Sequence, residues 1–378
     1  MVFLRKLARS RPSFHFSLFP RFLSYVRSSD TLEIYSTGSF DDLRREGCYY
    51  LDKTHFISKI EALRAPAILS LRPRSFGKTL FLSTLSSYYD IKNRERSEQL
   101  FGDLYIGKNP TKLASSFLVL KFNFIGLRTN STFEIFEENF NTGLNRFMSR
   151  FMNRYRQELG EYFRTVCINK DPLDNFMMLL EVVQLSDRKL YVCIDEYDAC
   201  MNEALKNETL LQSLNAYNNS SVQSKVEKIE SSFKQFYGLL KYACDEGIAR
   251  IFQTGVTPLV LTEFNISKDL ALIEEFWDMY GFKKSEIEFL LDKAFGNRLS
   301  ANIKEEIMSW LKEENDGYFF HRDQPEGIFN TARVLHCITG LMEGMKKFDG
   351  NWDPLVALDT LLDIPSPYRG TQSTPSRI

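Results

Sequence analysis

Apolar positions along the chain follow two different periods. Apolar runs of strand length occur at residues 68–71, 117–124, 189–195 and 247–254. Between the second and third run, apolar residues fall at intervals of 3, 4, 4, 3, 4 and 4: Phe133, Phe136, Phe140, Leu144, Phe147, Phe151 and Tyr155. This spacing predicts one long amphipathic helix whose aromatic stripe packs into a core. Buried strands that alternate with helices predict an α/β fold with a central, mostly parallel sheet.

Helical patterns also flank these runs. Residues 39–60 predict a helix that closes at Gly47, a brief strand at residues 48–51 and a second helix capped near Asp52. Residues 274–341 have apolar spacing that is helical by pattern. The sheet is therefore expected to carry helices before and after it.

A basic, glycine-containing turn follows the first apolar run. Residues 68–82 read I-L-S-L-R-P-R-S-F-G-K-T-L-F-L, so that Gly77, Lys78 and Thr79 open a helical stretch. The turn and the helix N-terminus offer unpaired N–H donors and a positive dipole end, which stabilise an anion. Lys78 would supply positive charge for the outer phosphates of a nucleotide, and Thr79 a hydroxyl ligand for Mg²⁺. The predicted nucleotide-binding residues are Arg72, Pro73, Arg74, Ser75, Phe76, Gly77, Lys78, Thr79 and Leu80.

Two adjacent carboxylates end the third run. Residues 189–198 read K-L-Y-V-C-I-D-E-Y-D. Ligands of parallel sheets lie outside the carboxyl ends of the strands, so both acids are expected beside the phosphate loop if the two strands are neighbours. Asp195 would hold Mg²⁺ through water, and Glu196 would polarise the water that attacks the γ-phosphate.

Each of these motifs has an ordinary structural explanation when taken alone. The loop departs from the usual G-x-x-x-x-G-K-[ST] pattern, because Arg72 stands where the first glycine is expected. A strand-to-helix turn with a surface lysine would account for it. Acids after a strand often serve as caps or turn residues. The combination of loop and acids is what favours a nucleotide site.

Composition excludes several other classes of protein. With 48 basic and 49 acidic residues in 378, no global field draws nucleic acid or membrane to the chain. No apolar stretch approaches the roughly 20 residues of a membrane span. Six cysteines without C-x-x-C spacing argue against a disulfide framework or structural zinc and favour a reducing compartment: Cys48, Cys167, Cys193, Cys200, Cys244 and Cys337. The length predicts two or three domains.

The two ends of the chain differ in composition from its middle. Residues 1–29 are rich in Arg and Ser and contain no acid, which is typical of a mitochondrial transit peptide. A disordered basic leader or a mispredicted start is the alternative, and the location is then cytoplasmic or nuclear. We expect a core at residues 30–270, a C-terminal helical subdomain at residues 271–362, and a disordered Pro-, Ser- and Thr-rich tail at residues 363–378.

Several motifs together resemble one family. They are G-C-Y-Y-L-D-K-T-H-F-I at residues 47–57, L-R-P-R-S-F-G-K-T-L at 71–80, L-F-G-D-L-Y-I at 100–106, I-D-E-Y-D at 194–198 and T-G-V at 254–256. This combination resembles the AAA-ATPase-like family over about residues 40–341. Members of that family also have Arg in place of the first loop glycine, so Arg72 fits the resemblance.

The resemblance implies an ATP-binding P-loop NTPase of the additional-strand type. In such proteins a polar side chain at the end of a further strand positions the attacking water and senses the γ-phosphate. Here that residue is Thr254, for which a simple cap is the alternative. The resemblance also implies a small C-terminal helical subdomain, of which a winged helix is one form. ATP and Mg²⁺ are the expected cofactors.

The chain also departs from the family pattern. Pro258 stands where members commonly have the Arg of T-G-V-S-R, and residues 259–270 are shortened, so a slow or lost hydrolysis step is one outcome. Many relatives continue into a nuclease domain, for which this chain stops too early. Two D-x-K triplets, at residues 90–92 in a helix and 187–189, are interpreted as surface charges. Nucleic-acid association is suggested by family context alone.

Three functions therefore remain open. The first is an ATPase in which Lys78, Thr79, Asp195 and Glu196 act as described. The second is a nucleotide-gated switch or scaffold that signals to a protein partner through its helical part. The third is a phosphotransferase, which is disfavoured because Glu196 beside Asp195 suits activation of water. The sequence identifies neither a partner nor an oligomeric state.

Overall fold

A computed structural model describes residues 37–125, 132–165, 171–214, 222–259, 265–315, 317–348 and 352–362. The predicted leader at residues 1–29 and the predicted tail at residues 363–378 lie outside the described residues, as does Cys167. Both segments stay predictions. None of the described helices is long and apolar enough to cross a membrane.

The centre of the fold is a sheet of five parallel strands in the order β2-β3-β4-β1-β5. The strands are β1 (Ala67–Leu71), β2 (Leu118–Asn123), β3 (Leu190–Asp195), β4 (Ala249–Gly255) and β5 (Ser267–Asp269). The predicted α/β fold with a parallel sheet is confirmed. The strand before the phosphate loop, β1, and the strand before the acids, β3, are not direct neighbours, because β4 lies between them. Their ends are therefore about 10 Å apart, two strand spacings.

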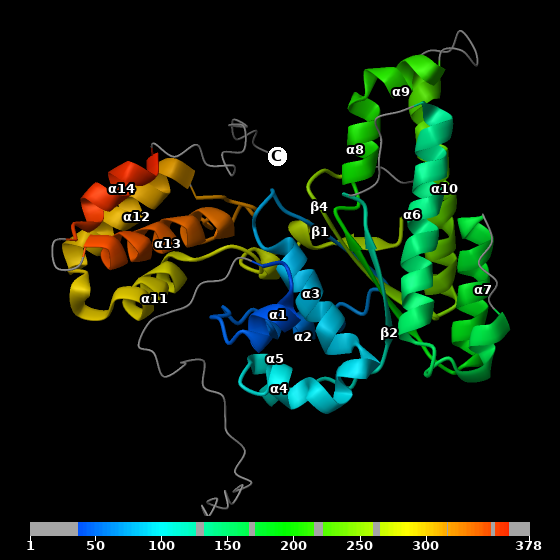
Figure 1. Ribbon diagram of the computed structural model, residues 1–378, viewed down its shortest axis with the longest axis horizontal. Helices are drawn as coiled ribbons and strands as arrows, with labels where there is room; N and C mark the ends of the chain where they lie inside the picture. The colour runs from blue at the N-terminus through cyan, green and yellow to red at the C-terminus, as the bar shows by residue number, and fades with distance from the viewer. Residues whose placement is uncertain are drawn as a thin grey trace, which may run out of the picture.

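Helices cover both faces of the sheet, which explains why the strands read as continuous apolar runs (Figure 1). The side chains of successive β3 residues point to opposite faces of the sheet. Leu190, Val192 and Ile194 belong to one core cluster, whereas Tyr191 and Cys193 belong to the other. All six residues of β3 are buried. Asp195, the last residue of β3, and Glu196, which follows it, are thus held by a strand with no solvent-exposed side.

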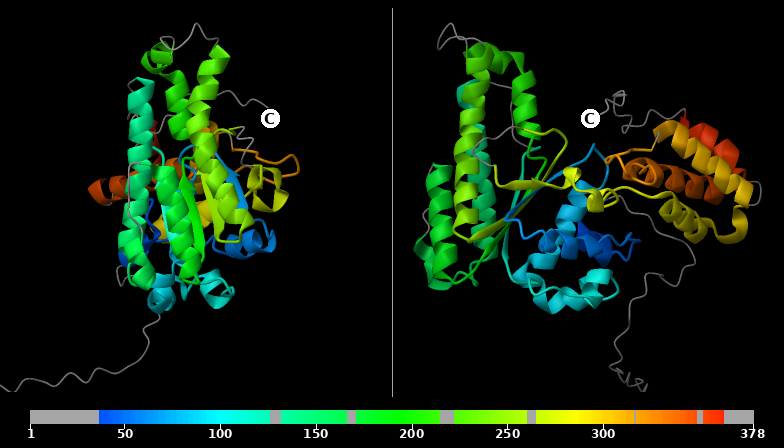
Figure 2. Two further views of the ribbon diagram at one scale, coloured as in Figure 1. Left: turned by 90° about the vertical axis from the view of Figure 1, so that its right-hand side faces the viewer. Right: turned by 180° about the vertical axis from the view of Figure 1, so that it is seen from behind.

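The first core cluster lies under a lobe of helices that faces the viewer in the left view of Figure 2. These are α6 (Phe133–Arg154), α7 (Pro172–Leu185), α8 (Ala199–Lys206), α9 (Glu208–Ser213) and α10 (Val222–Asp245), with the 3₁₀ helix η2 (Gly160–Thr165). The predicted aromatic stripe forms α6 and is buried as expected. Phe140 of α6 packs against Phe233 of α10 with ring centroids 4.7 Å apart. The stripe is therefore core packing.

The other face of the sheet carries shorter helices. They are α1 (Phe40–Arg45), α2 (His55–Ala62), α3 (Lys78–Tyr89), η1 (Ile91–Arg96), α4 (Ser97–Phe101) and α5 (Tyr105–Lys108). The strand predicted at residues 48–51 is wrong, because this segment pairs with no other strand among the described residues. Its alternation is nevertheless real. Cys48 and Tyr50 pack into the core beneath the sheet, and Tyr49 and Leu51 contact the C-terminal helices.

One of the two D-x-K triplets differs from its interpretation as surface charge in a helix. Asp90 lies after α3, is buried, and caps the 3₁₀ helix η1 through the amide of Lys92. It also pairs with Arg154 of α6 at 2.6 Å. Asp187 and Lys189 of the other triplet are exposed, as expected. Asp90 is therefore a structural acid that ties α3 to α6.

The C-terminal helices have a core of their own. They are α11 (Lys284–Phe295), α12 (Ala301–Asn315), α13 (Thr331–Phe348) and α14 (Pro354–Leu362), preceded by η5 (Leu270–Leu272) and η6 (Glu274–Phe276) and joined by η7 (Gly296–Arg298). In Figure 1 they lie beside the sheet, on the side opposite the long helices. Across the described residues after 280, strand pairing is confined to two isolated bridges, Phe282 with Phe329 and Tyr318 with Ile328. The winged helix stays a prediction.

Candidate functional site

The turn between β1 and α3 has the backbone of an anion-binding loop. Ser75 and Gly77 have φ values of 66° and 94°, and Gly77 is the residue from which α3 begins. Within the described part of the chain, the backbone N–H groups of residues 75–80 donate no hydrogen bond. Successive N–H groups that point into one concavity at a helix N-terminus attract an anion. The loop therefore offers the donors that the sequence predicted.

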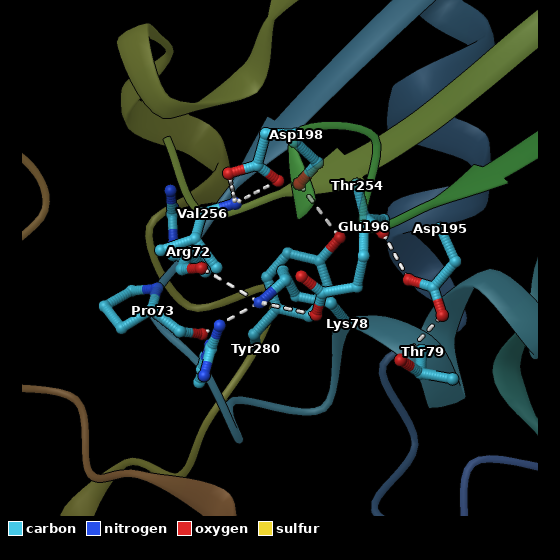
Figure 3. Close-up of polar contacts among 12 residues, drawn as sticks. Arg72, Pro73, Lys78, Thr79, Asp195, Glu196, Asp198, Thr254, Val256 and Tyr280 are labelled. Atoms are coloured by element: carbon cyan, nitrogen blue, oxygen red, sulfur yellow. Dashed lines mark hydrogen bonds and ion pairs between the residues drawn. The ribbon is translucent and has the colours of Figure 1, made fainter. Parts of the chain in front are cut away.

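Lys78 closes this loop from inside. Its ammonium is buried and donates to the carbonyl oxygens of Arg72 and Pro73, each at 2.9 Å (Figure 3). The nearest carboxylate oxygen, Oε1 of Glu196, lies 3.9 Å from Nζ. Burial lowers the pKa of Lys78, and Glu196 offsets this only in part. An anion bound at the loop would supply the close negative charge that the ammonium of Lys78 lacks here.

Asp195 joins the loop to the sheet. Its Oδ2 accepts a hydrogen bond from the hydroxyl of Thr79 at 2.9 Å and a longer one from Nδ2 of Asn123 at 3.4 Å. Its Oδ1 accepts from the hydroxyl of Thr254 at 2.6 Å. The structure thus brings together the hydroxyl of Thr79 in the loop, the carboxylate of Asp195 and the hydroxyl of Thr254. Thr254 lies on β4, the strand between β1 and β3.

Glu196 stands next to this group in an unusual backbone conformation. Its φ is 49°, a left-handed value that few residues other than glycine and asparagine adopt without an energetic cost. Burial raises the pKa of Glu196; Lys78 opposes this, while the charges of Asp195 and Asp198 add to it. A carboxylate with a raised pKa is a better proton acceptor than an ordinary glutamate. Its position suits a base beside the loop.

Sequence reasoning missed the role of Asp198, although it lies in the I-D-E-Y-D motif. Asp198 is buried and accepts from the amides of Val256 and Thr257, the latter at 2.7 Å, and from Nδ2 of Asn202 at 3.0 Å. It thereby holds the segment after β4 against the segment after β3, and its charge acts on Glu196. The available signal in the sequence was a second acid, Asp198, two positions after Glu196 at the end of a strand.

Two predicted nucleotide-binding side chains point away from this group. The guanidinium of Arg72 donates to the carbonyls of Leu71 and Phe276 and lies 4.2 Å from the ring centroid of Phe320. Burial lowers the pKa of Arg72 to about 10, so the group stays cationic at neutral pH. Phe76 is buried against Tyr318 and Phe320. Both contribute backbone to the loop and side chains to the C-terminal part.

The remaining loop residues fit the prediction to different degrees. The Pro73 carbonyl faces Lys78, while Ser75 and Thr79 are exposed beside it. Arg74 is also exposed, and its charge lowers the pKa of both Lys78 and Glu196. The side chain of Leu80 packs at the edge of the core.

The oxygen donors of Thr79 and Asp195 are those that Mg²⁺ takes when it binds together with phosphates and water. The described residues contain no cluster of three or more His, Cys, Asp or Glu that could form a closed metal cage. One hydroxyl and one carboxylate fit a metal that arrives with a nucleotide better than a permanently bound structural ion.

An all-parallel sheet with a Gly-Lys-Thr loop after one strand and acids after another is compatible with a P-loop-like domain. The chain belongs to the AAA-ATPase-like family, described as a predicted AAA-ATPase, whose family model matches residues 34–265. The predicted family is thereby confirmed, and ATP binding and an ATPase-like function follow from it in this general sense. The match ends before β5 and the C-terminal helices. A search of curated proteins finds no match to the chain.

Proposed function

We propose that the chain binds ATP with Mg²⁺ and hydrolyses it. One observation carries this proposal. Asp195 accepts a hydroxyl hydrogen bond from Thr79 of the loop and another from Thr254 of β4. Three segments separated by more than fifty residues each therefore meet at one carboxylate, beside a loop whose N–H groups are unused. A chance strand-to-helix turn has no reason to produce this convergence.

The proposed roles follow from the positions of the side chains. The N–H groups of residues 75–80 and Lys78 would bind the β- and γ-phosphates. Thr79 and Asp195 would hold Mg²⁺, which neutralises phosphate charge when bound. Glu196 would accept the proton of a water as its oxygen forms a bond to the γ-phosphorus and the bond to the bridging oxygen of ADP breaks.

Thr254 would orient Asp195 and sense the γ-phosphate. Its hydroxyl donates to a carboxylate and caps no helix among the described residues, which favours this role over a simple cap. The position of β4 between β1 and β3 supports the additional-strand type of P-loop NTPase, because such a strand places a third polar group between the loop and the acids.

A nucleotide-gated switch is the second candidate. Pro258 stands where family members have an arginine, which removes a positive charge that fast hydrolysis would use. Binding with weak hydrolysis would then signal through the C-terminal helices to a protein partner. A phosphotransferase is less well supported, since Glu196 lies where a water activator is needed. Association with nucleic acid rests on family context alone.

Two measurements separate these functions. An ATP-binding isotherm, with and without Mg²⁺, is expected to show binding by the wild type and its loss in Lys78→Ala, with exposed Lys189→Ala as the matched control. Steady-state phosphate release is expected to vanish in Glu196→Gln while ATP still binds, with exposed Glu203→Gln unchanged. Equal, negligible release by wild type and Glu196→Gln would favour the switch. Phosphate transfer to an added acceptor would favour the third function, and ATP binding unaffected by Lys78→Ala would refute the site.

A further inference from the structure

The carbonyl side of the phosphate loop is held by residues that lie more than two hundred positions later in the chain. Nδ2 of Asn330 donates to the carbonyl of Arg74 at 3.0 Å. The amide of Ala332 donates to the carbonyl of Ser75 at 3.2 Å. The hydroxyl of Thr331 donates to the carbonyl of Phe76 at 2.9 Å. Three successive carbonyls of the loop thus bind the start of α13.

Aromatic packing reinforces the same contact. The ring of Phe76 meets Tyr318 and Phe320 edge-on, with centroids 4.9 Å and 5.4 Å apart. The amide of Gly281 gives the Phe76 carbonyl a second hydrogen bond, at 3.2 Å. Gly281 has a φ of 73°, and a Cβ there would lie 2.6 Å from the carbonyl oxygen of Phe329. This close approach is possible because residue 281 is glycine.

The polar groups of the loop are therefore divided between two partners. The carbonyls of residues 74–76 point outward to the C-terminal part, and the N–H groups of the loop are left for an anion. In a peptide unit the N–H and C=O point in opposite directions. Fixing the carbonyls of residues 74–76 consequently orients the N–H groups of the residues that follow. The entropic cost of ordering the loop is therefore offset by contacts that do not involve a nucleotide.

We infer that Asn330 and Thr331 are positioning residues, which hold the phosphate loop in the conformation that accepts an anion. Docking of the C-terminal helices and nucleotide binding then favour each other, since a coupling between two equilibria is reciprocal. The half of this inference that concerns nucleotide rests on the proposed function. The half that concerns the conformation of the loop does not.

The test uses substitutions that remove a donor with little change of shape. Asn330→Asp keeps the acceptor that caps the amides of Ala332 and Arg333 but turns oxygen toward the carbonyl of Arg74. Thr331→Val removes the hydroxyl, and Thr331→Ser restores it. Asn207→Asp is the matched control, because Asn207 caps α9 in the same way, far from the loop.

The first readout is hydrogen exchange at the amides of Gly281 and Ala332, which donate to the loop carbonyls of Phe76 and Ser75, in the full chain without nucleotide. We expect exchange about fivefold faster in Thr331→Val and in Asn330→Asp, the effect of one lost hydrogen bond, and wild-type exchange in Thr331→Ser and Asn207→Asp. Wild-type exchange at these two amides in both Thr331→Val and Asn330→Asp, with their other helices intact, would overturn the inference. An equal increase in Thr331→Ser would also overturn it, since the hydroxyl would then have no role.

The second readout adds ATP and Mg²⁺. We expect slower exchange at the amides of Gly281 and Ala332 and a Kd for ATP about fivefold weaker in Thr331→Val, rescued by Thr331→Ser. Wild-type affinity in a variant whose loop is loosened would contradict the coupling. If the wild type binds no ATP, the proposed function fails, whereas the first readout still decides whether Asn330 and Thr331 position the loop.

Discussion

Thr254, near the end of β4, donates a 2.6 Å hydrogen bond to Oδ1 of Asp195, the last residue of β3. Both side chains are almost fully buried. The bond fixes the carboxylate so that its other oxygen, Oδ2, faces the hydroxyl of Thr79. A metal ion that arrives with phosphates would then meet an acid whose orientation is already set.

Removal of this hydroxyl is expected to affect both stability and activity. Thr254→Val leaves Oδ1 of a buried carboxylate without its donor, which costs about 2 kcal/mol of unfolding free energy. We expect ATP hydrolysis to fall about tenfold because Asp195 is no longer oriented, and Thr254→Ser to restore most of it. Urea denaturation and steady-state phosphate release measure the two effects. Full activity in Thr254→Val would limit Thr254 to a structural role.

The rate of hydrolysis is expected to depend on the ionisation of Glu196. Burial raises its pKa in the folded chain above the ordinary value of 4.5, so the carboxylate takes up a proton while other glutamates are still ionised. A base acts only when ionised, and kcat should therefore decline as the pH falls through this raised pKa. Arg74 lowers the pKa of Glu196, so Arg74→Met should move the decline to higher pH. Profiles of kcat against pH at saturating ATP, for the wild type and Arg74→Met, measure both the decline and its shift. A shift to lower pH in Arg74→Met would argue that another group controls the rate.

Asp198 is expected to be essential for the fold around the site. It is the acceptor for the amides of Val256 and Thr257 and for the side chain of Asn202. Asp198→Asn puts an amide donor where donors converge, so we expect a loss of about 2–3 kcal/mol in unfolding free energy. Asp187→Asn, at an exposed position with left-handed backbone that asparagine tolerates, should change stability by less than about 0.5 kcal/mol. Comparable urea midpoints for the two variants would show that Asp198 is dispensable.

The Asp-Lys-Thr motif near the start of the chain is tied to α11. Nζ of Lys53 lies 2.6 Å from Oε1 of Glu286, and Oε2 of Glu286 accepts from the amide of Lys283 at the start of α11. Because the pair is largely buried, Lys53→Met should cost about 3 kcal/mol, since it leaves the carboxylate with only the longer 3.9 Å ion pair to Lys283. Lys53→Met with Glu286→Gln should cost less than the sum of the single changes. Exposed Lys108→Met is the control, and strict additivity in this cycle would show that the pair does not couple.

The sequence predicted the elements that depend on periodic burial. The four longer strands and α6 are such elements, because a strand buried on both faces and a helix with one apolar stripe leave clear patterns. The segment at residues 48–51 has the alternation of a strand but lies between two groups of helices, so its side chains are buried without backbone pairing. The three-residue strand β5 is too short to leave a pattern.

The site was predicted in its local motifs but not in its long-range contacts. Lys78, Thr79 and Asp195 are recognisable because their chemistry is concentrated in short motifs. No local signal connects Asn330 and Thr331 to a loop that precedes them by some 250 residues, since an asparagine at a helix start is ordinary. The outward direction of the Arg72 side chain likewise depends on Phe276 and Phe320, which come together only in the folded chain.

Because of the left-handed backbone at Glu196, the residue that would give the highest stability at this position differs from the residue that the proposed hydrolysis needs. A glycine there would relax the peptide and lose the carboxylate, so selection for thermal robustness and selection for turnover would favour different residues at the same place. A variant library screened only for heat resistance should accordingly become enriched in inactive chains altered at this position.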